Sequence, residues 1–396
     1  MSLNNTPSAN RVHIGIFGKR NAGKSSIINA VTGQNLAIVS DTKGTTTDPV
    51  LKAMELLPLG PVVLIDTPGL DDEGNLGQLR IEKAYQILNK TDIALLVIDS
   101  AAGITTEDNK ILSRIKDKQI PYLIVMNKCE LASCSVPDDE EKHTIFVSAH
   151  TKENIETLKE KIAALAPSEE TSLPIVKDLL CENDLVMLVV PIDSSAPKGR
   201  LILPQQQTIR DILDAGAYSL VVKDTELKEA LATIGKKPRL VITDSQVFKK
   251  VSKDVPKDIP LTSFSILFAR HKGDLELVAK GAQALDTLKD GDTILISEGC
   301  THHRQCEDIG TVKLPNWVLN HTKKELHFEF TSGGEFPIDL SKYSLIIHCG
   351  GCTLNEREMK YRLRCAQDQN VPITNYGTAI AHINGILTRS LEPFQL

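Results

Sequence analysis

The most constraining feature of this sequence is a glycine-rich segment between an apolar run and a helical pattern. The run Val12–Phe17 has the alternation of a β-strand and continues directly into Gly18-Lys19-Arg20-Asn21-Ala22-Gly23-Lys24-Ser25. A helical pattern follows over residues 26–31. GxxxxGK[ST] between a strand and a helix is the context in which this motif forms a phosphate-binding loop. The chain is therefore predicted to begin with a nucleotide-binding α/β unit.

The residue types of this loop suit a nucleotide's phosphates and a magnesium ion. Its glycines let the backbone curl so that successive N–H groups face the phosphates, and the helix N-terminus adds its positive dipole end. Lys24 is expected to reach the β- and γ-phosphates, and the Ser25 hydroxyl to bind Mg²⁺. The predicted phosphate-binding residues are Asn21, Ala22, Gly23, Lys24, Ser25 and Ser26.

Further apolar strands alternate with amphipathic helices, and polar motifs follow the strands. The run 62–65 ends in Asp66-Thr67-Pro68-Gly69, where Asp66 suits Mg²⁺ and the Gly69 N–H suits a γ-phosphate. The runs 122–126 and 145–147 end in Asn127-Lys128-Cys129-Glu130 and Ser148-Ala149-His150. This alternation predicts a parallel sheet covered by helices on both faces.

Residues 11–165 resemble the translation-factor-related GTPases, especially the branch that includes Era and MnmE. The resemblance implies that Asn127 and Lys128 read guanine, and that Ser148 and Ala149 form the last base-contacting motif. Glu130 stands where the family has Asp; its carboxylate can still pair with the guanine N1–H and N2–H, although the extra methylene shifts it. GTP and Mg²⁺ are the implied ligands.

The same resemblance bears on catalysis. Gly44-Thr45-Thr46-Thr47-Asp48 is similar to the switch that the branch writes GTTRD, so Thr46 is expected to meet Mg²⁺ and the γ-phosphate. Leu70 stands where Ras-like enzymes place a water-orienting Gln. The Asn matching Asn21 helps to hold K⁺ in the MnmE-like branch. We therefore expect slow, K⁺-stimulated GTP hydrolysis, with catalytic residues Lys24, Thr46 and Gly69.

The rest of the chain is predicted to form two further α/β units. Residues 166–174, rich in Pro, Ser, Glu and Thr, indicate a linker. The predicted organisation is α/β with three domains: an N-terminal P-loop GTPase with a parallel sheet (1–168), a small α/β dimerisation domain (175–260) and a C-terminal α/β cluster-binding domain (261–396). The middle unit carries no clear catalytic set, as is common for an assembly domain.

Cysteines follow two predicted strands of the last unit. The strand 292–297 leads into Glu298-Gly299-Cys300-Thr301-His302, and the strand 343–347 leads into His348-Cys349-Gly350-Gly351-Cys352. Open α/β sheets place ligand sites at this edge. Three Cys with one other ligand suit a 4Fe-4S cluster. Zinc, a redox dithiol and inert thiols remain alternatives on chemistry alone.

The pattern CxH, a spacer of 45 residues and HCxxC resembles the signature of the HydF family, the FeFe-hydrogenase maturation GTPases. The resemblance implies a 4Fe-4S cluster on Cys300, Cys349 and Cys352, with His302 or Glu298 as an exchangeable fourth ligand and His348 as a third candidate. It implies a homodimeric scaffold that passes a di-iron CO/CN⁻ precursor to the FeFe-hydrogenase apoprotein. The implied partners are this apoprotein and the radical-SAM maturases.

Composition limits the alternatives. The net charge of −6 and the lack of a basic, aromatic-interleaved surface disfavour a nucleic-acid partner. No apolar run reaches the ~20 residues of a membrane helix, and the polar N-terminus predicts no signal peptide, so a cytoplasmic protein is expected. Two other readings remain: a zinc- or cluster-bearing GTPase of ribosome or tRNA maturation, and a nucleotide-gated module that binds a protein partner.

Overall fold

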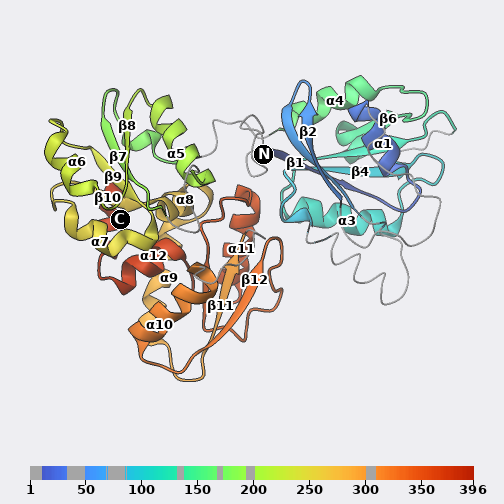
Figure 1. Cartoon of the computed structure of the whole chain (residues 1–396). Helices are drawn as coiled ribbons and strands as arrows, with labels where there is room; N and C mark the ends of the chain where they lie inside the picture. The colour runs from blue at the N-terminus through green and yellow to red at the C-terminus, as the bar shows by residue number, and fades with distance from the viewer. Residues whose placement is uncertain are drawn as a thin grey trace. The chain divides into compact units, whose positions relative to one another are not determined.

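The computed structural model describes residues 11–33, 50–67, 69, 85, 87–131, 138–166, 173–192, 201–299 and 309–396. By its internal contacts the chain divides into two compact units, residues 1–171 and 172–396. Each unit is an α/β structure (Figure 1), as the sequence predicted. No helix in the described ranges is long and apolar enough to cross a membrane.

The first unit is built on a six-stranded sheet with the order β2-β3-β1-β4-β5-β6. All neighbouring pairs are parallel except β2 with β3. The strands are β1 (Val12–Phe17), β2 (Val50–Leu56), β3 (Gly60–Asp66), β4 (Ile93–Asp99), β5 (Tyr122–Asn127) and β6 (Thr144–Val147). The helical segments are α1 (Lys24–Thr32), α3 (Thr106–Asp117), η2 (Asp138–His143) and α4 (Ile155–Ala164).

Helices cover both faces of this sheet, as predicted (Figure 1). Alternate residues of each central strand point to opposite faces. One core joins Ile14 and Ile16 of β1 to the buried sides of α1 and α4. The other joins Phe17 to the buried side of α3. Burial on both faces explains why these strands are almost continuously apolar. Because the pairs other than β2 with β3 are parallel, the carboxyl ends of these strands lie along one edge of the sheet.

The second unit contains two parallel sheets. The first has the order β10-β9-β7-β8, and the second β12-β11-β13-β14. The strands of the first are β7 (Leu185–Val189), β8 (Tyr218–Val222), β9 (Leu240–Thr243) and β10 (Leu261–Ser263). Its helical segments are η4 (Lys177–Leu179), α5 (Leu203–Asp214), α6 (Leu227–Thr233), η5 (Ser245–Val247), α7 (Phe248–Asp254) and α8 (Phe264–Lys272).

The second sheet of this unit carries the predicted cysteine segments. Its strands are β11 (Thr293–Glu298), β12 (His327–Ser332), β13 (Leu345–His348) and β14 (Ile373–Asn375). Its helical segments are α9 (Leu275–Ala282), η6 (Gln283–Thr287), η7 (Ile309–Lys313), α10 (Leu314–Thr322), α11 (Glu356–Asp368), α12 (Tyr376–Ile383), α13 (Leu387–Leu391) and η8 (Glu392–Phe394).

The two sheets share one hydrophobic core. It includes Met187 and Val241 of the first sheet and Leu295 and Ile346 of the second. Strand β10 pairs with β9, so the segment at 261, where the sequence analysis placed the start of the last domain, completes the first sheet. The apolar residues that follow form α8, because the Ser263 hydroxyl caps the helix by accepting from the Ile266 N–H at 3.3 Å.

Candidate nucleotide and cysteine sites

The glycine-rich loop forms a tight turn between β1 and α1, and two of its glycines are sterically required. Gly18 has φ 141°, and a Cβ there would lie 2.2 Å from the Val97 carbonyl oxygen. Gly23 has φ 91°, and a Cβ there would lie 2.2 Å from Nδ2 of Asn127. Neither position accepts a side chain without backbone movement, because the neighbours are fixed by the sheet.

Asn127 connects three of the segments that the sequence assigned to the nucleotide. Its Nδ2 donates to the Ala22 carbonyl of the loop at 3.0 Å, and its Oδ1 accepts from the Ala149 N–H at 3.1 Å. The side chain is 2% exposed. Its neighbour Lys128 has φ 64° and places Nζ 2.6 Å from Asp99. Asn127 therefore aligns the phosphate loop with the predicted base-reading segments.

Glu130, the unusual residue of the predicted base-reading motif, lies exposed beside this group. The Ser148 hydroxyl donates to its carboxylate, and this hydrogen bond holds the pKa of Glu130 below its usual value. The carboxylate is therefore ionised at neutral pH and positioned by another residue of the predicted guanine site.

Two of the residues predicted for magnesium, Ser25 and Asp66, lie together. The Ser25 hydroxyl donates to Oδ2 of Asp66 at 3.2 Å, whereas the buried Oδ1 has no hydrogen-bond partner among the described residues. Burial raises the pKa of Asp66, and the charge of Lys24 opposes this. A hydroxyl beside an unsatisfied buried carboxylate oxygen is a donor set suited to a hard cation, so these residues fit Mg²⁺.

Lys24 lies folded over the loop. Its Nζ donates to the carbonyls of Gly18 at 2.9 Å and Lys19 at 2.8 Å, so the ammonium group is already held at the loop. Gly69 is half-buried. Gly44-Thr45-Thr46-Thr47-Asp48 and Leu70 lie outside the described residues.

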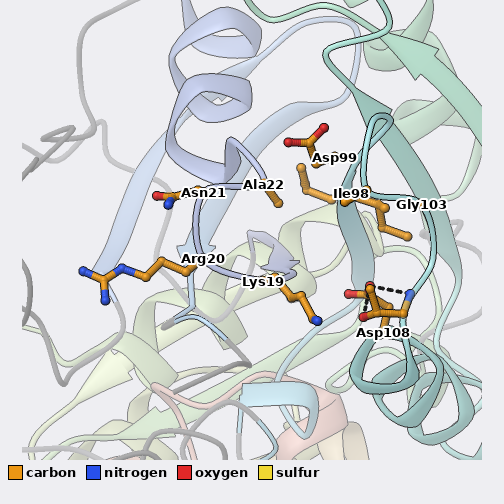
Figure 2. A pocket seen from close by; sticks show the side chains of 11 residues that line it. Lys19, Arg20, Asn21, Ala22, Ile98, Asp99, Gly103 and Asp108 are labelled. Carbon is orange, nitrogen blue, oxygen red and sulfur yellow. Dashed lines mark hydrogen bonds between the residues drawn. The ribbon is translucent and has the colours of Figure 1, made fainter. Parts of the chain in front are cut away.

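A cavity of about 120 Å³ lies beside the loop (Figure 2). Its lining joins the loop to the end of β4 and the start of α3, through Lys19, Arg20, Asn21, Ala22, Val97, Ile98, Asp99, Ala102, Gly103, Thr105 and Asp108. Lys19 pairs with Glu107 of α3 at 2.9 Å. Ligand pockets usually enclose about 300–1,000 Å³, so this cavity is too small for a whole nucleotide.

At the cysteine site, backbone N–H groups are directed at a buried sulfur. Sγ of Cys349, which follows β13, accepts from the N–H groups of Gly299 at 3.0 Å and Gly351 at 3.4 Å. Gly299 follows β11, the neighbouring strand, as the sequence analysis expected from the two strand ends. Cys300 and His302 lie outside the described residues. The N–H groups stabilise negative charge on the sulfur, a means by which proteins tune iron–sulfur clusters.

Cys352 shares this environment. Burial, reinforced by Cys349, raises the pKa of the Cys352 thiol to about 11, against the opposing charge of Lys272. Without a metal this group is therefore a thiol at neutral pH. Metal ligation requires the thiolate and releases the proton. Two cysteines of one CxxC segment, with N–H donors at the Cys349 sulfur and a buried cation beside them, fit an iron–sulfur cluster as ligands.

Sequence reasoning missed Lys272, the cation beneath the cysteine loop. It is the last residue of α8 and is 3% exposed. Its Nζ donates to the carbonyls of Gly351 and Cys352 at 3.2 Å and of Leu354 at 2.8 Å. Burial lowers its pKa to about 8. The one sequence signal was a lysine at the end of a mostly apolar helix, which does not reveal a contact 80 residues away.

A second missed cation, Arg362 of α11, is completely buried. It donates to Glu358 at 2.9 Å, to the Ser297 hydroxyl at 3.1 Å and to the Gly333 carbonyl at 2.8 Å. It also donates to Nε2 of His348 at 2.9 Å. Because a guanidinium group only donates, this ring nitrogen is an acceptor.

The other ring nitrogen of His348 is also engaged. Its Nδ1 donates to the Cys349 carbonyl at 2.7 Å, and the residue is 1% exposed. Both nitrogens are therefore used inside the protein, and His348 supports the loop. Glu298 is buried at the end of β11, where its Oε1 accepts from the Tyr376 hydroxyl at 3.2 Å.

Comparison with known families matches three successive parts of the chain. Residues 13–128 match the 50S ribosome-binding GTPase family, residues 175–273 the hydrogen maturase F dimerization domain, and residues 276–393 the hydrogen maturase F tetramerization domain. The chain belongs to the hydrogen maturase F (HydF) family. Its matches describe a GTPase domain followed by domains named for dimerization and tetramerization.

The HydF matches refine the predicted organisation. The dimerization match extends through β10 and α8, in agreement with the sheet to which β10 belongs. The last match describes a tetramerization domain, an assembly role that the sequence analysis did not anticipate.

Curated relatives match the GTPase part of this chain. The tRNA modification GTPase MnmE of Desulforamulus reducens is 37% identical over 157 residues, which are 39% of this chain and 32% of that protein. MnmE of Nitrosomonas europaea is 38% identical over 152 residues, 37% of this chain and 33% of that protein. The matched stretches span about a third of these relatives.

Among solved structures, a variant of Era from Aquifex aeolicus bound to GDP·AlF4⁻ is 21% identical, with a TM-score of 0.35, over 56% of this chain and 98% of that chain.

Proposed function

We propose that this protein is a GTP-hydrolysing scaffold that holds a 4Fe-4S cluster on Cys300, Cys349 and Cys352 and delivers a di-iron precursor to the FeFe-hydrogenase apoprotein. The observation that supports this most directly is the Cys349 sulfur, which accepts hydrogen bonds from two backbone N–H groups. Cys349 lies at a sheet edge within the part of the chain that matches the HydF tetramerization domain. The di-iron CO/CN⁻ group is cargo in this proposal, received with the help of radical-SAM maturases.

The chain's own residues prepare the site for an anionic group. Two N–H groups and the Lys272 ammonium group, which lies against the cysteine loop, offset thiolate charge. When bound, the cluster supplies one exchangeable coordination position for the precursor. His302 is our preferred ligand at that position, because Oε1 of the other candidate, Glu298, is engaged by Tyr376.

At the nucleotide, we propose a role for each predicted site residue. Asn127, Lys128 and Glu130 read guanine together with Ser148 and Ala149. The N–H groups of residues 21–26 and the Lys24 ammonium group hold the phosphates, and Ser25, Thr46 and Asp66 serve Mg²⁺. The Gly69 N–H orients the γ-phosphate. These groups position the substrate and stabilise charge, which is most of what phosphoryl transfer requires.

Hydrolysis is proposed to be slow and stimulated by K⁺. Leu70 supplies no hydrogen bond to orient the attacking water. Asn21 is exposed in the loop at φ 60°, with a side-chain oxygen available for a monovalent cation. GTP turnover is expected to rise several-fold when Na⁺ is exchanged for K⁺, and Asn21→Ala to remove the difference. Equal turnover in both salts would contradict the K⁺ role.

Anaerobic reconstitution with iron and sulfide tests the scaffold proposal. The wild-type protein is expected to turn brown, with broad absorption near roughly 400 nm from cluster charge transfer. Cys300→Ala, Cys349→Ala and Cys352→Ala should each lose most of this absorption while GTP turnover persists. Cys181→Ala, at an exposed cysteine in the same unit, is the matched control and should keep the colour. A colourless zinc protein would contradict the proposal.

A tRNA-binding measurement separates this function from that of the curated relatives. MnmE proteins are named for tRNA modification, and this chain has a net charge of −6. We propose a cytoplasmic protein without a nucleic-acid partner, and the expected readout is tRNA binding no tighter than that of an unrelated acidic protein at physiological salt.

A further inference from the structure

Three side chains converge on one point away from the cysteine site. Oδ1 of Asp286 lies 2.9 Å from Nε2 of His321, and Oδ2 of Asp286 lies 2.9 Å from Nε2 of His382. The two imidazole rings meet edge to face, with centroids 5.8 Å apart. In the described part of the chain, these residues form the one group of three potential ligands whose atoms all lie within 4.8 Å of one another.

We propose that Asp286, His321 and His382 form a second metal site, which binds a divalent first-row transition metal through two imidazoles and one carboxylate. Metal–nitrogen bonds of about 2.0–2.1 Å place neighbouring ligand atoms roughly 3 Å apart around one ion. The two nitrogen–oxygen distances already have that size. An ion replaces the two N–H···O hydrogen bonds when both imidazoles are neutral and present their Nε2 lone pairs.

Packing fixes the helical segments that carry the ligands. Asp286 lies in η6 next to Leu285, and His321 and His382 lie three residues after Val318 and Ala379. These apolar neighbours belong to one buried cluster. Little reorganisation is therefore needed for binding, which favours a metal site over three mobile surface side chains.

Electrostatics at this place also favour a cation. His321 lies in the last turn of α10, and His382 in the last turn of α12. Helix carboxyl ends carry partial negative charge. The Asp286 carboxylate, which accepts from both imidazoles, adds a third electron-rich group at the same place.

The site lies at the amino ends of strands β11 and β12, whereas Cys349 follows the carboxyl end of a strand of the same sheet. Asp286 precedes the start of β11, and His321 precedes the start of β12, whose first residues pair with each other. Cys349 follows the carboxyl end of β13. The second site therefore has its own ligands, and it is not an extension of the proposed cluster site.

The ligand set determines the class of metal. Imidazole and carboxylate suit zinc and iron(II), and two His with one carboxylate leave further coordination positions open. The Asp286 side chain is 55% exposed, against 25% for His321 and 17% for His382, so the open positions face solvent on the carboxylate side. The ion joins α10, α12 and η6, and it remains accessible to water or to a small anionic ligand.

Calorimetric titration of the full-length protein with Zn²⁺ tests the site. The protein carries Cys300→Ser, Cys349→Ser and Cys352→Ser, so that these thiolates do not take up the metal. One equivalent is expected to bind, and Asp286→Asn, His321→Ala and His382→Ala should each weaken it at least tenfold. His327→Ala, at an exposed histidine of β12, is the matched control and should bind as the parent does. An anaerobic Fe²⁺ titration distinguishes iron from zinc by relative affinity.

A second measurement tests the site without the cysteine substitutions, in case the substituted protein does not fold. Cluster-loaded wild-type protein, with these cysteines occupied, is heated with and without Zn²⁺. The ion should raise the Tm of the wild type and of His327→Ala, but not that of His382→Ala. Equal zinc affinity in His382→Ala and His327→Ala would overturn the proposal. So would lower metal-free stability of the His variants with unchanged zinc binding, because the three residues would then be a hydrogen-bonded contact alone.

Discussion

The nucleotide and cysteine sites occupy equivalent places in two different sheets, yet the groups that face their ligand-binding atoms differ in charge. Each lies where parallel strands end, the usual position for ligands in open α/β sheets. At the first, beside the Ser25 hydroxyl, a buried oxygen of Asp66 has no hydrogen-bond partner among the described residues. At the second, the buried charged groups that contact the cysteine loop and His348 are the cations Lys272 and Arg362.

This difference explains how one architecture serves two chemistries. A buried carboxylate oxygen without a partner favours a cation, as the magnesium of a nucleotide complex provides. Buried cations and N–H groups directed at sulfur favour anionic thiolates. The shared sheet edge therefore supplies position, and the sign of the buried charge selects the ligand.

The largest expected effect concerns the buried cation of the second unit. Arg362→Leu leaves Glu358 buried without its partner, and breaking such a pair costs about 3–5 kcal/mol. Scanning calorimetry should show a lower Tm for the second unit alone. Arg364→Leu, at an exposed arginine of the same helix, should change the unfolding free energy by less than about 0.5 kcal/mol. Equal effects of the two variants would show that the Arg362 contacts carry no stability.

Lys24→Ala tests whether the two sites are chemically separate. Loss of one charged group that stabilises the transferring phosphoryl group lowers turnover about 100- to 1,000-fold. Steady-state GTP hydrolysis should fall by that factor while the iron content after reconstitution is unchanged. Lys110→Ala, at an exposed lysine of α3, should leave both quantities as in the wild type. A parallel loss of iron would break the comparison.

Asp66→Asn sharpens the account of the buried carboxylate. Burial raises the pKa of Asp66, so the ionised form destabilises the fold, and this cost appears as pH rises through the folded-state pKa. At pH 7 without magnesium the variant should have a higher Tm than the wild type. The Mg²⁺ concentration for half-maximal GTP turnover should rise about tenfold or more, roughly 1.4 kcal/mol. An unchanged magnesium requirement would remove Asp66 from the site.

The smallest effect is expected at Glu130. Glu130→Asp restores the family's shorter carboxylate, and a better guanine contact is worth up to about 1 kcal/mol, roughly a fivefold gain in GDP affinity. Fluorescence titration with a labelled GDP measures it. Inosine diphosphate, which lacks the 2-amino group, should gain less, and an equal gain for both nucleotides would count against a guanine contact.

Local motifs were predictable because their residues are close in sequence and directly follow the strands that position them. The phosphate loop, the ends of β3 and β5 and the cysteine segment after β13 all occur where the sequence indicated. Fold class and the HydF family also followed, since hydrophobic periodicity and two spaced motifs carry that information.

Contacts between distant segments were not predictable. Lys272 reaches a loop 80 residues away, and Asp286 meets His382 across 96 residues. Periodicity reports which face of a helix is buried, but not which neighbour lies against it. For the same reason the start of the last domain was predicted at 261, although the strand there, β10, pairs with β9.

The central claim is that the nucleotide site and the cysteine site are chemically separate. Its most direct test is electron paramagnetic resonance of the reconstituted, dithionite-reduced protein. The account predicts the signal of a reduced 4Fe-4S cluster in the wild type and in Lys24→Ala, and its absence in Cys352→Ala, which still hydrolyses GTP. A wild-type protein without the signal, or a Cys352→Ala protein with the full signal, would contradict it.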